Sequence, residues 1–270
     1  MNLAFIGGGN MASALIGGLV NGGVDARGVR VVEPYPAQQD KLLSRFPGIG
    51  IFAEVTAGAI DGADLVLLAV KPQQMEEAAG AVASFVTSVP VVMSIAAGTR
   101  ISDLSRWLGG YARIVRAMPN TPALIGAGVS GAFAPVEVNA ASRKLASRVL
   151  EAAGTVVWVN REEMLDAVTG VSGSGPAYVF YFLEAMEQAA RELGFSAADA
   201  RTLAYGTFAG ATKLAQASEL EPGILRAQVT SKNGTTERAL ATLEAAHVKA
   251  HIIDAVKAAA ERARELGEGK

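Results

Sequence analysis

The 270-residue chain contains no cysteine. This absence excludes disulfides, thiol nucleophiles, CxxC redox chemistry and cysteine metal sites, and it favours a cytoplasmic location. An excess of charge is also lacking, because 24 Lys and Arg oppose 26 Asp and Glu and leave a net charge of -2. Such a chain is a poor candidate for binding nucleic acid or an anionic membrane. The apolar N-terminus lacks a basic leader and is interrupted by glycines, so we expect neither a signal peptide nor a membrane span there.

Histidine is scarce as well. The two histidines, His247 and His251, are four residues apart on a predicted helix and could share one of its faces. Neither an HExxH glutamate nor an evident third ligand accompanies them, so no metal site is expected. The GxSxG motif of a serine nucleophile elbow is missing too, since Ser174 stands in GSG without the required spacing.

Apolar residues, in contrast, make up half of the chain, which is enough for a buried core. In the first half, short runs without polar alternation are separated by segments with helical periodicity. Such runs are typical of parallel strands buried on both faces, and their alternation with helices predicts a doubly wound, Rossmann-type α/β sheet. We expect strands within residues 3–6, 29–32, 64–70, 90–96, 112–117, 129–134 and 155–159.

From Arg161 onward the sequence has no convincing strand. Helical patterns cover residues 176–193, 197–218 and 235–266. We therefore expect a dinucleotide-binding α/β domain over residues 1–160 and an all-α domain over residues 161–270. About 110 helical residues are few for an independent core, so we expect them to bury apolar surface against a second copy of the chain.

A glycine motif follows the first predicted strand and opens a predicted helix. Residues 7–12 (GGGNMA) fit the G-x-G-x-x-G/A pattern of dinucleotide-binding proteins. Gly7 permits the tight turn, Gly9 lets backbone N–H groups approach a pyrophosphate, and Ala12 lets the helix pack closely on the strand. Asn10 and Met11 fall in the first helical turn, which favours negative charge. The alternative is that the glycines only form a turn.

An acidic residue, Glu33, follows the second predicted strand, 21 residues after Ala12. This is close to the spacing of about 20 residues for the acid that binds the adenosine ribose. Such a carboxylate repels a 2′-phosphate and favours NAD over NADP; a solvated turn residue is the alternative. The residues after the third buried run are expected at the cofactor-binding edge of the sheet: Ala69, Val70, Lys71 and Pro72. Lys71 could touch the ribose or be an ordinary loop lysine.

Three more turns contain residues suited to ligand binding. Asn120 and Thr121 lie between two prolines after a predicted strand and are held rigidly. Residues 170–178 (GVSGSGPAY) join glycines and serines to a helix start that would suit a small carboxylate. Thr235 and Thr236 follow a second hydroxyl-rich turn, and either could donate to a substrate. The alternatives are a rigid connection, a capped helix start and an N-cap threonine.

Together these segments resemble the pyrroline-5-carboxylate reductase family over nearly the whole chain. The motifs FIGGGNMA, AVKPQ, RAMPNTPA, TGVSGSGPAY and TSKNGTTE occur in the family's order. The resemblance implies a Rossmann domain followed by a helical dimerisation domain, which interlocks subunits into dimers and, in many members, decamers. It also implies reduction of the C=N bond of 1-pyrroline-5-carboxylate by NADPH or NADH to L-proline, the last step of proline biosynthesis.

The resemblance also implies roles for residues in these motifs. The cofactor would contact the glycine motif, Glu33, the loop at Lys71, and the pair Asn120 and Thr121. The substrate carboxylate would be held by Ser172, Gly173, Ser174 and Gly175, together with Ser231, Asn233, Gly234, Thr235 and Thr236. Thr236, which matches the threonine of the family's G-x-T, would donate to the ring nitrogen. A second subunit would complete the site.

Two positions depart from the family's pattern. Lys232 and Asn233 replace the Pro-Gly of the usual TSPGGTT turn, although asparagine tolerates the left-handed conformation that glycine would use. Glu33 stands where members that prefer NADPH often carry a small polar or basic residue. The choice between NADH and NADPH therefore stays open.

Two rival functions are less favoured. A β-hydroxyacid dehydrogenase-like oxidoreductase would also have a Rossmann domain followed by helices. The enzymes with that chemistry carry a lysine on the interdomain helix, whereas residues 177–190 of this chain contain no lysine. A non-catalytic, dinucleotide-binding redox sensor would keep Gly7, Gly9 and Ala12 but would have no use for the hydroxyl-rich turns.

Overall fold

The computed structural model describes residues 1–269, which form two compact units. The α/β unit contains residues 1–174 and the residues from 257 onward, and the helical unit contains Gly175–Val256. The predicted boundary after residue 160 lies inside the α/β unit, and the assignment of domains on either side of it stays a prediction.

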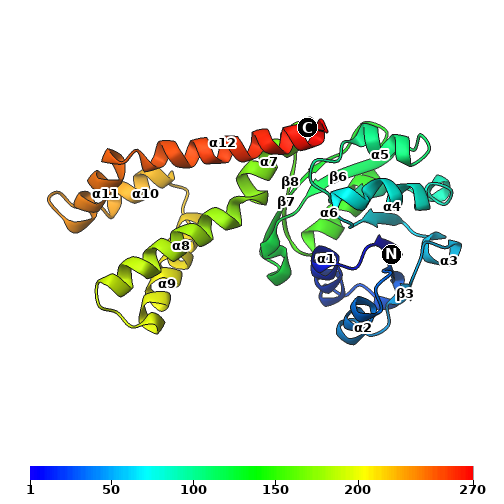
Figure 1. Ribbon diagram of the computed structural model, residues 1–270, viewed down its shortest axis with the longest axis horizontal. Coiled ribbons are helices and arrows are strands. Elements are labelled where there is room, and N and C mark those ends of the chain that lie inside the picture. The colour runs from blue at the N-terminus through cyan, green and yellow to red at the C-terminus, as the bar shows by residue number, and fades with distance from the viewer. Residues whose placement is uncertain (270) are drawn as a thin grey trace. The chain divides into compact units, whose positions relative to one another are not determined.

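Eight strands form one sheet in the α/β unit, in the spatial order β3-β2-β1-β4-β5-β6-β7-β8. Figure 1 shows helices flanking this sheet. The strands are β1 Leu3–Ile6, β2 Val29–Val32, β3 Gly50–Phe52, β4 Leu65–Leu68, β5 Val92–Ser94, β6 Ile114–Met118, β7 Gly128–Phe133 and β8 Gly154–Trp158. All neighbours are parallel except β6 and β7, which are antiparallel. The seven predicted strands are confirmed. β3 lies outside the prediction because three half-buried residues beginning with glycine form no apolar run.

Helices cover both faces of this sheet, which explains the continuous apolar runs. On β1, Leu3 and Phe5 belong to a core shared with α1, α2 and α6, whereas Ala4 and Ile6 belong to a core shared with α3, α4 and α5. The α-helices are α1 Asn10–Asn21, α2 Pro36–Arg45, α3 Ala57–Ile60, α4 Met75–Val82, α5 Ile101–Trp107, α6 Ala140–Glu151 and α7 Met164–Val168. The 3-10 helices are η1 Ala26–Gly28, η2 Pro72–Gln74, η3 Val86–Ser88 and η4 Thr121–Ile125, and η5 Thr169–Gly173 is a π-helix.

The helical unit contains no strand among the residues that the structure describes, as predicted. Its helices are α8 Gly175–Glu192, α9 Ala197–Gln216, α10 Pro222–Gln228, α11 Thr235–Ala245 and the first part of α12 Val248–Gly267. The α8 and α9 helices pack against each other.

The prediction of one helix over residues 235–266 is wrong. Ala246 is the C-cap of α11, and His247 takes the left-handed conformation with a φ of +52° before α12 begins. Neither residue is glycine or proline, so the sequence carries no signal for this break. His247 therefore lies outside the helix that carries His251, and the two histidines do not belong to one helix.

Within residues 1–269 no group of three or more His, Cys, Asp or Glu side chains could hold a metal ion. None of the helices in this range combines the length and the apolar composition that crossing a membrane requires.

Candidate active site

The loop between β1 and α1 is tight at its first two glycines and open at the third. Gly7 has a φ of +99°, and an added Cβ would lie 2.9 Å from the Ala69 carbonyl oxygen, so only glycine suits this position. Gly8 is buried, and its added Cβ would lie 2.5 Å from Leu42 Cδ1. Gly9 is exposed, and its added Cβ would meet nothing within 4 Å. A ligand can therefore approach the backbone at Gly9.

The start of α1 adds free donors to this open side. Gly9 is the N-cap, and no side chain in residues 1–269 caps the helix. The first-turn N–H groups, including those of Asn10 and Met11, have no acceptor inside a helix and carry partial positive charge. Ala12 is fully buried and packs in the core beneath them. This arrangement fits the pyrophosphate of a dinucleotide.

Glu33 follows β2 and is only 6% exposed. Its Oε2 accepts the Gly8 N–H at 2.9 Å, and its Oε1 accepts the Tyr35 N–H at 3.0 Å. The alternative of a solvated turn residue is therefore excluded. Each carboxylate oxygen keeps a further lone pair, so the group can still accept from a ligand hydroxyl.

A cleft of about 330 Å³ extends from the glycine loop along the ends of β2 and β4. Its walls include predicted cofactor residues: Gly7, Gly9, Glu33, Ala69, Val70 and Lys71. Glu54 and Glu77 also line it, so the described part of the cleft is lined by three carboxylates and by one cation, the ammonium of Lys71. Lys71 is exposed, and Pro72 beside it begins η2. The local charge is thus negative.

Asn120 connects two of the predicted segments. Its Nδ2 donates to the Ser172 carbonyl oxygen at 3.0 Å, and its Oδ1 accepts the Val129 N–H at 2.8 Å. Thr121 is exposed at the start of η4. An added Cβ on Gly173 would lie 2.7 Å from Met118 Cε, so the turn packs closely on the end of β6. The structure therefore brings residues 118–121 and 172–173 together.

The Ser172 hydroxyl is a buried polar atom without a partner. Its Oγ has no hydrogen bond among the residues that the structure describes. Buried hydroxyl groups in folded proteins usually have a hydrogen-bond partner, so the Ser172 hydroxyl is available to a ligand. Ser174 is half-buried, and its N–H donates to the Thr169 carbonyl oxygen at 2.8 Å.

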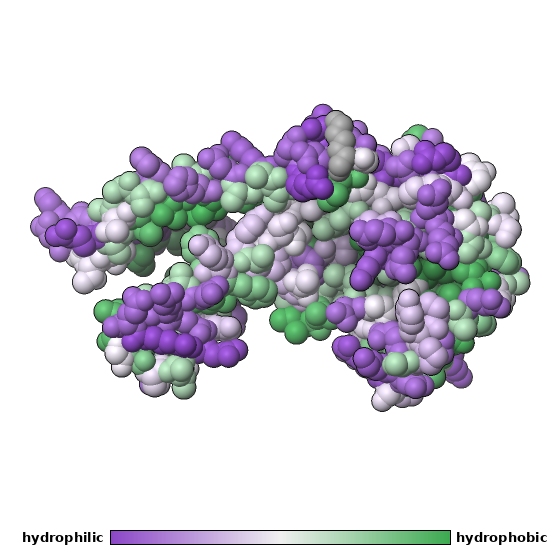
Figure 2. All heavy atoms as spheres, viewed as in Figure 1, coloured by the Kyte–Doolittle hydropathy of each residue, from purple (hydrophilic) through white to green (hydrophobic). Residues whose placement is uncertain are grey.

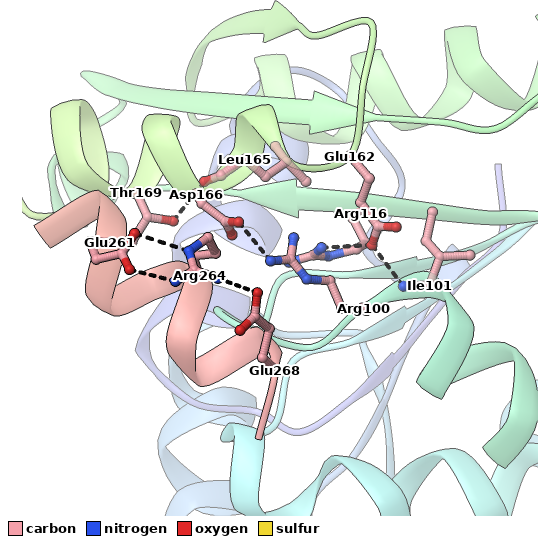
Figure 3. Close-up of polar contacts among 10 residues, drawn as sticks. All are labelled: Arg100, Ile101, Arg116, Glu162, Leu165, Asp166, Thr169, Glu261, Arg264 and Glu268. Carbon is pink, nitrogen blue, oxygen red and sulfur yellow. Dashed lines mark hydrogen bonds and ion pairs between the residues drawn. The ribbon is translucent and has the colours of Figure 1, made fainter. Parts of the chain in front are cut away.

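Two partly buried ion pairs hold α7, the helix that leads into η5 and Ser172, and the residues just before it (Figure 3). Arg100 donates to Asp166 at 2.6 Å, and Arg116 donates to Glu162 at 2.6 Å. The same Glu162 oxygen accepts the Ile101 N–H at 2.7 Å. Burial lowers the pKa of the Arg116 guanidinium, and its hydrogen bond to Glu162 opposes that shift.

This cluster is absent from the sequence-based predictions. The ion-pair partners are 66 and 46 residues apart, and no local pattern links them. The last turns of α12 lie beside the cluster, where Arg264 pairs with Glu261 and Glu268 (Figure 3). The signal that sequence reasoning could have used is the pair of arginines next to predicted strand ends.

In the helical unit, the turn between α10 and α11 contains the remaining predicted residues. Asn233 has a φ of +58°, which confirms that asparagine takes the left-handed conformation here, and its N–H donates to Glu237 Oε2 at 2.7 Å. Gly234 is the N-cap of α11, and its added Cβ would lie 2.4 Å from Ser231 Oγ.

Thr235 and Thr236 are therefore the first two helical residues of α11. The alternative of an N-cap threonine is excluded, since Gly234 occupies the N-cap position. Within residues 1–269 no hydrogen bond of either hydroxyl is present, and Thr236 is half-buried. Gly175, the last predicted substrate residue, begins α8.

Comparisons with known proteins match both parts of the chain. A family model described as pyrroline-5-carboxylate reductase dimerisation matches residues 162–266. A second, described as NADP oxidoreductase coenzyme F420-dependent, matches residues 2–98. The chain is 44% identical over 266 residues to the pyrroline-5-carboxylate reductase of Pseudomonas aeruginosa, covering 98% of this chain and 97% of that one. It is 39% identical to that of Haemophilus influenzae, with the same shares covered.

Solved structures agree with these relatives. A pyrroline-5-carboxylate reductase from Coxiella burnetii is 37% identical, with a TM-score of 0.92 over 98% of both chains. The Plasmodium falciparum pyrroline carboxylate reductase with NADP bound is 26% identical, with a TM-score of 0.87 over 99% of this chain and 98% of that one.

Proposed function

The chain belongs to the pyrroline-5-carboxylate reductase family, and from this premise we propose how its residues reduce 1-pyrroline-5-carboxylate to L-proline. It is an NAD(P)H-dependent oxidoreductase of proline biosynthesis, acting on the C=N bond of a cyclic imine. One observation carries the assignment of residues: the glycine loop is closed around Gly7 and Gly8 and open at Gly9, where α1 offers free N–H groups.

The dinucleotide would bind in the cleft beside this loop. The backbone N–H groups of Gly9, Asn10 and Met11 would hold its pyrophosphate, and Ala12 lets α1 start close to the sheet. When bound, the reduced nicotinamide supplies the hydride for the imine carbon. The rest of the cofactor site would be formed by Ala69, Val70, Lys71 and Pro72, with Asn120 and Thr121.

NADH is the proposed preferred form of the cofactor. Glu33 is buried and held by two backbone N–H groups, so it cannot easily turn away from a ribose 2′ substituent. A ribose hydroxyl can donate to this carboxylate, whereas a 2′-phosphate would be repelled by it. Glu54 and Glu77 add to the negative charge of the cleft.

The substrate carboxylate would be held by two turns. The first turn contains Ser172, Gly173 and Ser174 of the α/β unit, followed by Gly175, and its Ser172 hydroxyl has no partner among the described residues. The second turn, in the helical unit, contains Ser231, Asn233, Gly234, Thr235 and Thr236. Thr236 would donate a hydrogen bond to the ring nitrogen, and a second subunit would complete the site.

The reaction needs little acid catalysis from the protein. A neutral imine nitrogen would accept the Thr236 hydrogen bond, which polarises the C=N bond, and orienting the imine supplies much of the remaining acceleration. This is compatible with hydroxyl and backbone donors in the two turns, without a catalytic histidine or lysine there.

Steady-state kinetics on the purified chain test the proposal. We expect oxidation of both reduced cofactors with 1-pyrroline-5-carboxylate, with a higher kcat/KM for NADH. Glu33→Gln should shift the NADH to NADPH ratio of kcat/KM toward NADPH by roughly tenfold, since one charge repulsion is removed. Glu76→Gln, on the exposed face of α4 outside the cleft, is the matched control.

Other outcomes would contradict specific parts of the proposal. An unchanged ratio in Glu33→Gln would remove Glu33 as the selector. Cofactor binding without turnover would support the redox sensor instead.

Self-association and location complete the proposal. The dimerisation model over residues 162–266 supports a dimer formed by the helices. We propose that dimers assemble further into decamers and that the protein acts in the cytoplasm. Light scattering and cell fractionation would test these two points.

A further inference from the structure

Both polar groups of Gly8 are hydrogen-bonded to side chains from the segment after β2. The Gly8 N–H donates to Glu33 Oε2 at 2.9 Å, and the Gly8 carbonyl oxygen accepts from Gln38 Nε2 at 2.6 Å. Gln38 is half-buried in the first turn of α2. The middle glycine of the loop is therefore held by side chains 25 and 30 residues away in the sequence.

The bond to the Gly8 carbonyl also orients the Gly9 N–H. These two groups belong to one peptide unit, and in a trans peptide the C=O and N–H point in opposite directions. The described chain contains no cis peptide bond. Because Gln38 holds the Gly8 carbonyl toward α2, the Gly9 N–H is directed away from α2, and within residues 1–269 it has no hydrogen-bond partner.

Orientation of this peptide has to come from outside the loop. Residues 7–9 are three consecutive glycines, and glycine has more backbone freedom than any other residue. An N–H group that is already oriented binds an anion more tightly than one that must first be ordered, because the ordering cost is avoided.

We propose that Gln38 is a positioning residue that pre-orients the Gly9 N–H for the pyrophosphate of the cofactor. It acts through Gly8, since Gln38 is not among the described residues that line the cleft. The inference rests on the proposed function in one respect, namely that a dinucleotide binds at this loop.

Gln39 provides a matched control on the same helical turn. It is also half-buried, and its Nε2 donates to a backbone carbonyl, that of Glu33, at the same 2.6 Å. Loss of this bond removes a comparable contact but leaves the Gly8 carbonyl bonded. A difference between variants at the two positions therefore reports on the glycine loop rather than on general stability.

The test uses Gln38→Met and Gln39→Met in the full chain, because methionine has a similar length but cannot donate. Calorimetric titration with ADP-ribose should show about tenfold weaker binding for Gln38→Met, the equivalent of one ordinary hydrogen bond. Gln39→Met should stay within about twofold of the unsubstituted protein. In the ligand-free protein, amide exchange at Gly8 measured by NMR should be faster in Gln38→Met and unchanged in Gln39→Met.

Each contrary outcome has a separate meaning. Unchanged ADP-ribose affinity in Gln38→Met, or an equal loss in both variants, would overturn the positioning role. Unsubstituted protein that binds neither NADH nor ADP-ribose would overturn the proposed function and this inference with it. If the protein binds ADP-ribose but does not reduce the imine, the proposed function fails while the role of Gln38 stands.

Discussion

The two units differ in how much apolar surface one chain buries. In the α/β unit, residues such as Phe5 and Leu67 are fully buried between sheet and helices. In the helical unit, the buried apolar residues of the described chain are Leu183, Ala200 and Ala204. Figure 2 shows apolar side chains at the surface of this unit, where the large exposed ones include Phe180, Tyr181, Leu193, Leu214 and Val229.

This difference indicates that the units are stabilised in different ways. The α/β unit has a complete core, whereas the helices leave apolar faces that one chain does not cover. Exposed apolar surface of this extent is typical of a protein–protein interface. Together with the match to a dimerisation family, it indicates that the helical unit is completed by another subunit.

The largest expected effect concerns ion pairs in the two units. Glu162→Ala would leave Arg116 buried without its partner, and such losses cost about 3–5 kcal/mol of the free energy of unfolding. Glu244→Ala would break the exposed pair with Arg226, which should cost about 0–1 kcal/mol. Urea unfolding of both variants measures the difference. Equal losses of unfolding free energy in the two variants would show that the burial of Arg116 does not make its ion pair more important for stability than the exposed pair.

The second prediction tests whether a substitution in the helical unit can lower the catalytic activity without lowering the stability of the fold. Thr236→Ala should lower kcat/KM for 1-pyrroline-5-carboxylate roughly a hundredfold, since a donor to the reacting ring is lost. Its melting temperature should stay unchanged. Thr242→Ala is the control, because the Thr242 hydroxyl donates only to the Arg238 carbonyl oxygen on the same helix. Full activity in Thr236→Ala would remove its proposed role.

The third prediction compares exposed apolar residues. Phe180 in the helical unit is 62% exposed, and Val136 in the α/β unit is 93% exposed. Phe180→Glu should weaken self-association by about 2 kcal/mol, as expected for an interface residue, and Val136→Glu should have almost no effect. Sedimentation velocity over a concentration series measures both. A stable dimer in Phe180→Glu would place the interface elsewhere.

The same difference explains how much of the fold is predictable from the sequence. Strands buried on both faces, such as β1 and β4, produce continuous apolar runs and are predicted well. The break at His247 is not predictable, because a left-handed histidine in an Ala- and Glu-rich segment resembles continuous helix. The helical unit has few buried positions to fix its periodicity, so the local pattern is less informative there.

The candidate site divides in a similar way. Gly7 is predictable because its positive φ and its close approach to Ala69 require glycine. Gln38 is not, since its role depends on a bond across 30 residues to a backbone carbonyl. Glutamine in the first turn of a surface helix carries no signal by itself. A backbone conformation that requires glycine, as at Gly7, appears in the sequence, whereas long-range side-chain contacts need the folded structure.

The smallest expected effect lies inside the helical unit, where local backbone terms weigh more because the core is small. His247→Gly should raise the free energy of unfolding by about 1 kcal/mol, because glycine adopts a φ of +52° without strain. His251→Gly, four residues on and also exposed, should lower it by roughly 0.5 kcal/mol, because glycine is a poor helix former. Thermal melts of the two variants should therefore shift in opposite directions. Shifts of the same sign would mean that the turn between α11 and α12 is stabilised by contacts of the histidine ring that outweigh its backbone strain.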